Sequence, residues 1–344
     1  MQNITEMLLQ KYGLVKGESS MIKNLAIITL NYNGSEDTIE CIKSLDDSIT
    51  EYKYDIYILD NASAKEEVEK IRDYIGTRKD FSILPCDEFR GGQCSGNYLV
   101  VSSENYGFAG GNNKIVDCVQ EYYDYVLLLN NDTVVTNDFI DTMLNYLYSN
   151  REVKFASCRI DNYYDRNLLW NCGGELKPWG VRRYFSADEL GKMPEIITTE
   201  FITGCALYID TILLRKHGGL TEDFFFGEED FNFCWRMKRL GVKGKCVNRT
   251  LVYHKVSVSS KNAGVLPGKL AGYFVNRIVD MKQFYPYLVW LCWREILIFV
   301  LGIKWTRMNI DRVDVKKMKY VLREKSHNSS VTKEDTFSVW NLFA

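Results

Sequence analysis

The stretch YVLLLNNDT, residues 125–133, decides the fold of this 344-residue chain. It begins with an apolar run typical of a buried strand and continues into the polar residues Asn130, Asn131 and Asp132. In open α/β sheets, ligands bind beyond the carboxyl ends of the strands. The stretch therefore predicts a central strand with the Asp132 carboxylate, a hard oxygen ligand, at the mouth of a site. Taken alone, an Asp in this place is more often a turn former.

Strand and helix patterns alternate on the N-terminal side of this stretch. Leu25–Asn31 and Tyr54–Leu59 are short apolar runs that end in turn signals, as buried strands do. Ser35–Leu45 and Lys65–Ile75 have apolar residues at helical spacing. Parallel strands need crossover connections, which are usually helices, so this alternation predicts an α/β fold with a parallel sheet covered by helices.

A glycine-rich stretch, Asn105–Asn113, precedes the central strand. We expect it to be a loop that leads into a helix ending near Tyr122, because glycines allow the backbone to approach a ligand closely. A turn that only caps a helix would have a similar composition. Beyond the central strand, the patterns predict a helix over 137–148 and strands over 153–158, 169–173, 201–209, 243–247 and 250–253.

Three consecutive acids, Glu228, Glu229 and Asp230, open the segment GEEDFNFCWR, residues 227–236. Gly227 is typical of the turn before a helix, so the acids are expected in its first turn. Unpaired N–H groups and the helix dipole favour negative charge there, which predicts that the carboxyl groups stay ionised at neutral pH. The alternative is an acidic helix start on the protein surface.

Composition excludes several classes of protein. A net charge of -2 and a pI near 6.1 give no general attraction to nucleic acid. The ten cysteines contain no CxxC pair, and the three histidines form no zinc-binding pattern. Reduced thiols in a cytoplasmic protein are the simplest interpretation.

The two ends of the chain differ from its middle. Residues 1–22 are expected to be a leader without the features of a secretory signal, before a catalytic unit over 23–284. The extension over 285–344 holds two apolar segments, Leu288–Trp293 and Ile296–Ile303, separated by Arg294 and Glu295. Lys304–Lys325 then carries eight Lys or Arg against three acids. This pattern suits an in-plane helix on the inner face of the cell membrane. The alternative is a pair of helices packed on the catalytic unit or on another subunit, and in the second case the protein would be a homo-oligomer.

Seven segments, in this order and spacing, resemble the family 2 glycosyltransferases of the glycosyltransferase-A fold, especially their bacterial rhamnosyltransferase-like branch. The resemblance covers about residues 24–282 and implies a Rossmann-like, mostly parallel sheet flanked by helices. The segments are LNYNG (30–34), ILDNAS (58–63), NYGFAGGNN (105–113), LLLNNDT (127–133), ITGCALYI (202–209), GEEDFNFCWR (227–236) and YHKVSVS (253–259).

The resemblance also implies roles for individual residues. Asp230 matches the catalytic base, with Glu229 beside it, and Asp132 and His254 match the metal site for Mg²⁺ or Mn²⁺. Asn130 stands where many members of the family have the first Asp of the metal-binding DxD-type motif, and Asp132 matches its last acid. The residues matching the donor site are Thr29, Asn31, Asp60, Gly107, Gly110, Gly111, Asn112, Asn130, Asn131 and Arg277. Each of three residues also has a structural interpretation that does not depend on the resemblance. Asp60 could cap the helix that follows it, His254 could be a structural histidine, and Arg277 could be an arginine on a helix surface.

The implied activity is inverting transfer of a sugar from a nucleotide diphosphate sugar to a hydroxyl of a glycan or lipid-linked acceptor, in bacterial surface polysaccharide synthesis. The rhamnosyltransferase-like branch favours L-rhamnose from dTDP-rhamnose, with UDP-hexoses as the alternative donors. A sugar nucleotidyltransferase would need an Arg- and Lys-bearing loop after the first strand, which LNYNGSED (30–37) lacks. A non-catalytic homologue that binds nucleotide sugars or glycans is the alternative of another class.

Overall fold

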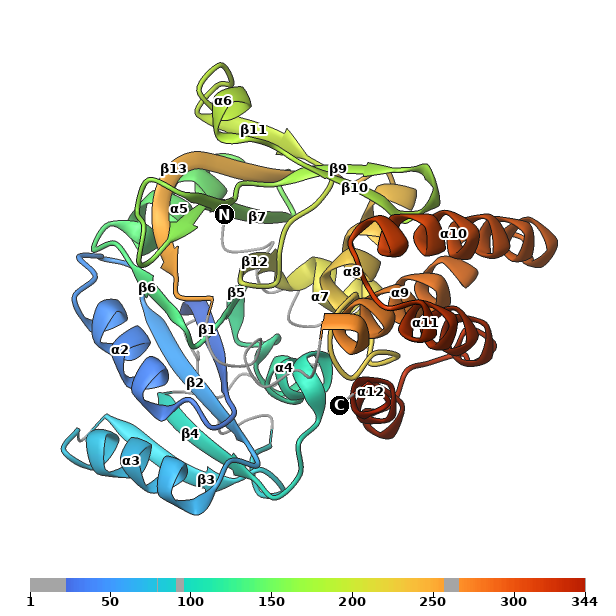
Figure 1. The fold of residues 1–344 in the computed structure, drawn as a ribbon. Coiled ribbons are helices and arrows are strands. Elements are labelled where there is room, and N and C mark those ends of the chain that lie inside the picture. The colour runs from blue at the N-terminus through green and yellow to red at the C-terminus, as the bar shows by residue number, and fades with distance from the viewer. Residues whose placement is uncertain (1–22, 79, 91–95, 257–265, 344) are drawn as a thin grey trace.

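The computed structural model describes residues 23–78, 80–90, 96–256 and 266–343. The expected leader and the last three residues of the YHKVSVS segment lie outside these ranges. The first half of the central sheet is entirely parallel, as the alternation of strands and helices predicts, and β1 lies between β2 and β5 (Figure 1). Ile27 of β1 is paired with Ile56 on one side and Leu127 on the other. In spatial order these strands are β3 (Phe81–Pro85), β4 (Asn97–Ser102), β2 (Tyr54–Asn61), β1 (Lys23–Asn31) and β5 (Tyr123–Leu129).

The second half of the sheet is mixed. β12 (Ala206–Asp210) lies antiparallel between β5 and β7 (Phe155–Asn162), and β13 (Gly244–His254) runs parallel to β7. The sequence predicted two strands where β13 is one, because register shifts near Thr250 interrupt the apolar pattern without ending the strand. The smaller strands are β6 (Thr133–Val135) on β13, β8 (Leu169–Asn171) on β7, β11 (Ile196–Thr199) at the edge, and the hairpin of β9 (Gly174–Lys177) and β10 (Val181–Tyr184).

Helices cover both faces of the sheet and enclose two apolar cores (Figure 1). One face carries α2 (Ser35–Asp46), α3 (Lys65–Gly76) and α5 (Phe139–Ser149). The other carries α4 (Gly107–Val119), α7 (Thr211–His217), α8 (Glu229–Arg239) and α9 (Leu266–Lys282). Two short helical turns, η1 (Pro178–Gly180) and α6 (Ala187–Leu190), connect the outer strands. The arrangement is the mixed α/β fold with flanking helices that the sequence predicts.

The glycine-rich stretch is not the loop that we expected. Residues from Gly107 onward form the first turns of α4. Gly111 packs so closely on the sheet that an added Cβ would lie 3.1 Å from Leu30 and 3.3 Å from Leu59. The small residues therefore allow α4 to pack close to β1 and β2. Close helix packing and a ligand-binding loop both favour glycine, so the composition of this stretch does not distinguish them.

The C-terminal residues form α10 (Tyr287–Arg307), α11 (Arg312–Lys325) and α12 (Lys333–Asn341) beside α9. Arg294 and Glu295 do not divide α10 into two segments. Arg294 is buried and donates a hydrogen bond to Ser326 Oγ at 3.1 Å, so it lies on the packed face of one continuous helix. Within the described residues, every helix is too short or too polar to span a membrane.

Candidate active site

Strand pairing brings together the two residues expected to bind a metal. Asp132 follows β5 and immediately precedes β6, where Thr133 pairs with His254 at the end of β13. The Asp132 Oδ1 and His254 Nε2 atoms lie 3.0 Å apart. Trp170 packs edge-on against the imidazole, with ring centroids 4.3 Å apart. The pair is thus fixed by the sheet, although 122 residues separate its members.

This pair fits a divalent metal that is shared with a ligand. No third His, Cys, Asp or Glu within the described ranges completes a cluster able to hold an ion alone. Mg²⁺ usually takes one or two carboxylates and fills its remaining positions with substrate phosphates and waters. The buried Nδ1 of His254 has no hydrogen-bond partner among the described residues, so the ring is not held by a structural bond at that atom. A carboxylate oxygen beside an imidazole nitrogen suits Mn²⁺ as well as Mg²⁺.

The two asparagines before Asp132 have structural contacts. The Asn131 Nδ2 donates to Thr38 Oγ1 at 2.9 Å and holds the start of α2 against the sheet. The main-chain N–H of Asn130 donates to the carbonyl oxygen of Cys205 at 2.9 Å. Asn130 therefore joins the end of β5 to the loop that leads into β12.

The acidic segment begins α8 with an unusual turn. Glu228 is the N-cap, with a left-handed φ of 94°, and both Glu228 and Glu229 are buried. Asp230 is partly exposed, and its Oδ2 accepts a hydrogen bond from the Gly204 N–H at 3.1 Å. Three consecutive acids therefore have three different surroundings.

Burial outweighs the helix dipole at this helix start. Desolvation, followed by the negative charge of Asp230, raises the pKa of Glu229 to about 7. Burial also raises the pKa of Asp230, against the opposing effects of the Gly204 N–H and the positive charge of Arg182. The expectation of an ordinary, fully ionised carboxyl group is therefore wrong for Glu229, because the sequence does not reveal how deeply α8 begins inside the protein.

A short loop joins the segment before Asp132 to the acidic helix start. Cys205 accepts the hydrogen bond from Asn130, two residues before Asp132, and the adjacent Gly204 donates to Asp230. Burial, followed by the negative charge of Asp132, raises the pKa of the Cys205 thiol, and the charge of Asp230 adds a smaller contribution. Residues 204–205 therefore contact both the segment that precedes Asp132 and the Asp230 carboxylate.

Sequence reasoning missed Arg182, which lies above this site. It comes from β10, and its guanidinium forms an ion pair with Glu228. Burial, followed by the positive charge of Arg277, lowers the pKa of Arg182 to about 10. The only signal in the sequence was the Arg182-Arg183 pair in a hairpin without a recognisable motif, and 46 residues separate Arg182 from Glu228.

Arg277, expected to contact a diphosphate, lies beside Arg182. Both arginines donate hydrogen bonds to the Tyr273 hydroxyl of α9. Burial lowers the pKa of Arg277, and its Nε has no hydrogen-bond partner among the described residues. Two guanidinium groups side by side, both shielded from solvent in part, repel one another, and an anion between or beside them would relieve that cost.

The residues expected around a nucleotide base form a closed network at the ends of β1 and β2. Asp60 is fully buried, and its Oδ2 accepts from Asn31 Nδ2 at 2.7 Å. Its Oδ1 accepts from the Ser63 N–H at 3.0 Å, so Asp60 holds the turn before α3. The buried Thr29 hydroxyl nearby has no hydrogen-bond partner among the described residues. In this structure Asp60 supports the strand end, which is one of the two roles the sequence allowed.

The four residues of the glycine-rich stretch that were expected near the donor take part in packing α4. Gly107 has a left-handed φ of 72° and abuts the Phe225 main chain. Gly110 packs on Tyr106, as Gly111 does on the sheet. The Asn112 Nδ2 donates to the Phe108 carbonyl oxygen at 2.9 Å, within the helix. These contacts place the start of α4 beside the aromatic residues that precede the acidic segment.

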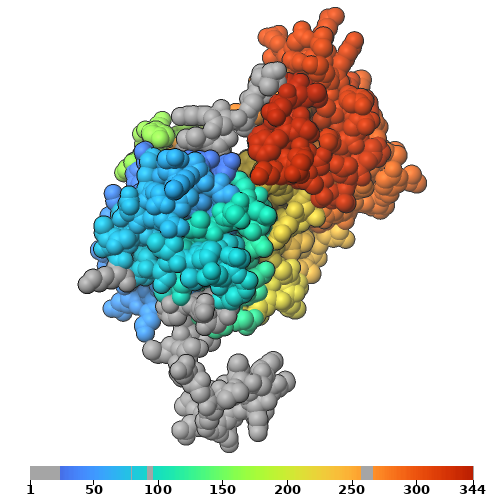
Figure 2. Space-filling view, turned by 90° about the horizontal axis from the view of Figure 1, so that it is seen from below, coloured from blue at the N-terminus to red at the C-terminus, as the bar shows by residue number. Residues whose placement is uncertain are grey.

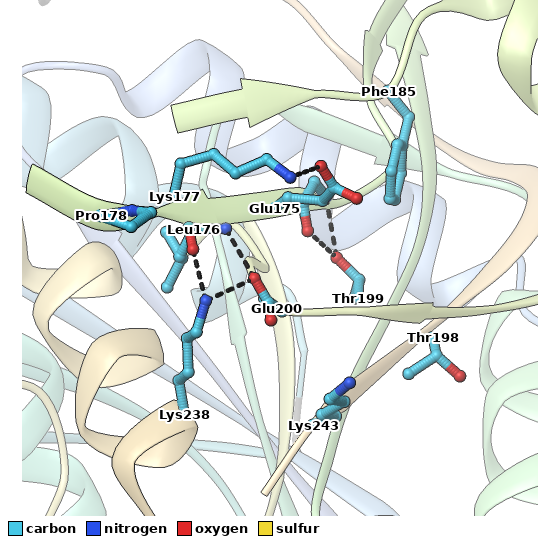
Figure 3. Close-up of a pocket in the computed structure, with 11 residues that line it drawn as sticks. Glu175, Leu176, Lys177, Pro178, Phe185, Thr198, Thr199, Glu200, Lys238 and Lys243 are labelled. Atoms are coloured by element: carbon cyan, nitrogen blue, oxygen red, sulfur yellow. Dashed lines mark hydrogen bonds and ion pairs between the residues drawn. The ribbon is translucent and has the colours of Figure 1, made fainter. Parts of the chain in front are cut away.

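Two cavities lie near the site without containing the predicted residues. One, of about 690 Å³, opens between the start of α2 and the end of β13, and Lys255 lines it directly after His254. The other, of about 260 Å³, lies between β9, β11 and the far end of α8 (Figure 3). Lys238 and Glu200 pair there at 2.8 Å, so its charges are largely neutralised internally.

Comparison with known proteins decides the family. A model described as glycosyl transferase family 2 matches residues 26–214, more than half of the chain. The chain belongs to glycosyl transferase family 2. The family match includes Asp60 and Asp132 and ends before Asp230, His254 and Arg277. No curated protein matches the chain.

Solved structures share the fold of this family 2 glycosyltransferase at low identity. GalNAc-T7 with UDP, GalNAc and Mn²⁺ is 13% identical, with a TM-score of 0.55 over 78% of this chain and 52% of that chain. The Pyrobaculum calidifontis mannosyltransferase PcManGT with GDP-Man and Mn²⁺ is 11% identical, with a TM-score of 0.52 over 95% and 93%. S. aureus TarS with UDP-GlcNAc is 11% identical, with a TM-score of 0.52 over 92% and 87%. This chain spans about half the length of the GalNAc-T7 structure.

Proposed function

We propose that this glycosyltransferase moves a sugar from a nucleoside diphosphate sugar to a hydroxyl group, by a single displacement that inverts the anomeric carbon. The observation that carries the proposal is the loop at residues 204–205. Cys205 accepts a hydrogen bond from Asn130, two residues before Asp132, and Gly204 donates one to Asp230. These contacts support the proposal that a metal-binding carboxylate, Asp132, and a second carboxylate that acts as a base, Asp230, serve one site.

On the donor side, the proposed roles are to bind the diphosphate and to neutralise its negative charge. Asp132 and His254 would hold Mg²⁺ or Mn²⁺, which neutralises the charge that grows on a diphosphate leaving group. Two proteins of similar fold were solved with Mn²⁺, which supports a divalent ion. Arg277 and Arg182 are cationic groups close to the same site, and we propose that they bind diphosphate oxygens. Thr29, Asn31 and Asp60 would then shape the nucleoside end of the donor site.

On the acceptor side, we propose Asp230 as the general base. The Oε1 of Glu229 is buried without a hydrogen-bond partner among the described residues, whereas Asp230 is partly exposed and oriented by Gly204. Asp230 would accept the proton of the attacking hydroxyl as the new C–O bond forms and the bond to the diphosphate breaks. Its raised pKa makes it a stronger base than an ordinary aspartate.

We propose dTDP-L-rhamnose as the donor, and the support is the sequence resemblance to the rhamnosyltransferase-like branch. UDP-hexoses are the second candidates, because two proteins of similar fold were solved with UDP or UDP-GlcNAc. The proposed acceptor is a glycan or lipid-linked oligosaccharide of a bacterial surface polysaccharide. A catalytically silent sugar-binding protein is the competing function, and the presence of Asp230 argues against it.

A panel of nucleotide sugars tests this proposal. Thermal unfolding would be measured with dTDP-rhamnose, UDP-hexoses and GDP-mannose, each with Mn²⁺ or with EDTA, and nucleotide release would be followed for every donor that raises the unfolding temperature. We expect one donor to stabilise the protein only with the metal and to be turned over. Stabilisation without any nucleotide release, in the presence of a broad set of acceptors, would identify a binding protein instead.

A further inference from the structure

The helix α10 is apolar on two opposite faces, and only one of them is covered. Its buried residues recur every three or four positions and pack on α9 and α11: Trp290, Arg294, Ile298, Leu301 and Trp305. The residues two positions away point to the opposite side. Leu288, Ile296 and Phe299 on that side are 72%, 64% and 63% exposed.

The exposed face is long and continuous. It runs from Leu288 through Cys292, Ile296 and Phe299 to Ile303, which at the helical rise is about 22 Å. Val300 and Tyr287 widen it. In Figure 2, the orange and red C-terminal helices form one end of the molecule, away from the blue N-terminal elements. Single exposed apolar residues are ordinary, but a row of this length on one helix indicates a surface that is covered in use.

Cations surround the end of this face. Lys304 and Arg307 are exposed on the last turns of α10, and Lys316 and Lys317 are exposed on the adjacent α11. The stretch Lys304–Lys325 has eight Lys or Arg against three acids, although the whole chain has a net charge of -2. This stretch therefore has a net charge of +5, whereas the rest of the chain has a net charge of -7.

The nearest acid on α10 is already neutralised. Glu295 accepts ion pairs from both Arg294 and Arg323, at 2.8 Å each. Only Asp311 and Glu324 remain as exposed acids in the stretch over 304–325. A contact between two copies of this chain would thus bring together basic rims with few carboxylates to pair them.

We infer that the α10 face, defined by Leu288, Ile296, Phe299, Val300 and Ile303, binds the surface of an anionic lipid bilayer. The helix would lie in the plane of the membrane, with these apolar side chains among the lipid headgroups and outer acyl carbons. Lys304, Arg307 and the basic residues of α11 would contact the anionic headgroups. This inference goes beyond the proposed function and does not depend on it.

Flotation with vesicles tests the inference on the full chain. Phosphatidylcholine vesicles would be compared with vesicles that also contain phosphatidylglycerol, at low and high salt. We expect binding to the anionic vesicles that weakens as salt is added. The double variant Ile296→Glu/Phe299→Glu should bind at least about tenfold more weakly. Lys316→Gln/Lys317→Gln should weaken binding about fivefold for each charge removed.

A matched control separates this face from general exposure of apolar residues. Leu168 and Ile212 are 56% and 60% exposed elsewhere on the protein, and the variant Leu168→Glu/Ile212→Glu should bind vesicles like the unmodified chain. Circular dichroism and thermal unfolding would show that every variant is folded. Absence of anionic-vesicle binding, or equal binding by both glutamate pairs, would overturn the inference. A dimer seen by light scattering that Ile296→Glu/Phe299→Glu dissociates, without vesicle binding, would assign the face to a second copy.

Discussion

Replacing Arg182 with methionine tests the arginine that the sequence did not reveal. The change removes the positive partner of Glu228 while keeping a long, flexible side chain in the same space. The Glu228 side chain is 1% exposed, and its Oε1 has no hydrogen-bond partner among the described residues. The Arg182→Met variant therefore leaves a buried carboxylate without its compensating charge.

The expected cost follows from that burial. Removing one partner of a buried ion pair typically destabilises a protein by roughly 3–5 kcal/mol. With an unfolding entropy of about 2.1 cal/mol/K per residue, a chain of 344 residues has about 0.7 kcal/mol/K in total. The variant should therefore unfold about 4–7 °C below the unmodified protein.

A second substitution separates the charge effect from lost packing. In the double variant Arg182→Met/Glu228→Gln no charge is left buried without a partner, so it should recover most of the lost unfolding temperature. Arg183→Met is the control: its side chain is 44% exposed and pairs with Glu175 and Glu189 at the surface, where ion pairs contribute at most about 1 kcal/mol. Thermal unfolding at neutral pH gives the comparison. Equal unfolding temperatures for Arg182→Met and Arg183→Met, or no recovery in the double variant, would refute the reasoning.

The site and the fold yield three further predictions. Glu229 has a pKa of about 7 in the folded protein and an ordinary value near 4.5 in the unfolded chain. Between these two pH values the folded state binds the proton more tightly, so the free energy of unfolding should fall by up to about 3 kcal/mol as pH rises from about 4.5 to about 7. Glu229→Gln should remove this dependence in unfolding experiments at pH values on either side of the window, and parallel curves for both proteins would contradict it. Asp132→Asn should abolish the Mn²⁺-dependent stabilisation by the donor, and an unchanged thermal shift would argue against a metal at this residue. Gly111→Val should lower the free energy of unfolding by about 1–3 kcal/mol, because the added side chain forces α4 away from the sheet. Gly76→Ala should be neutral, because an added Cβ there has nothing within 4 Å. Similar unfolding temperatures for the two variants would disprove the packing argument.

The strands β1, β2 and β5 could be predicted from the sequence because each is a short apolar run that ends in a turn. This placed Asp132 at the mouth of the site, and the structure puts it beside His254. The meeting of these two residues depends on the pairing of β6 with β13, which local patterns do not encode. Only the family resemblance linked them beforehand.

Other features could not be predicted because they depend on burial and on distant contacts. The pKa values of Glu229 and Asp230 are raised by the depth at which α8 begins, and a sequence of three acids indicates only a helix start. Arg182 is brought to Glu228 by a hairpin with no motif. Arg294 is read as an interruption of an apolar segment until the fold shows it turned toward Ser326. In each case the sequence does not show which face of the helix or strand is packed against the rest of the protein.

The central claim is that Asp230 is the base of a metal-assisted sugar transfer. The most direct test compares Asp230→Asn with the unmodified protein, measuring donor binding with Mn²⁺ and then the rate of nucleoside diphosphate release in the presence of acceptor. We predict unchanged donor binding and a rate lowered by about 10²–10⁴-fold, because loss of a general base affects only the proton transfer. Normal turnover by Asp230→Asn would contradict the account.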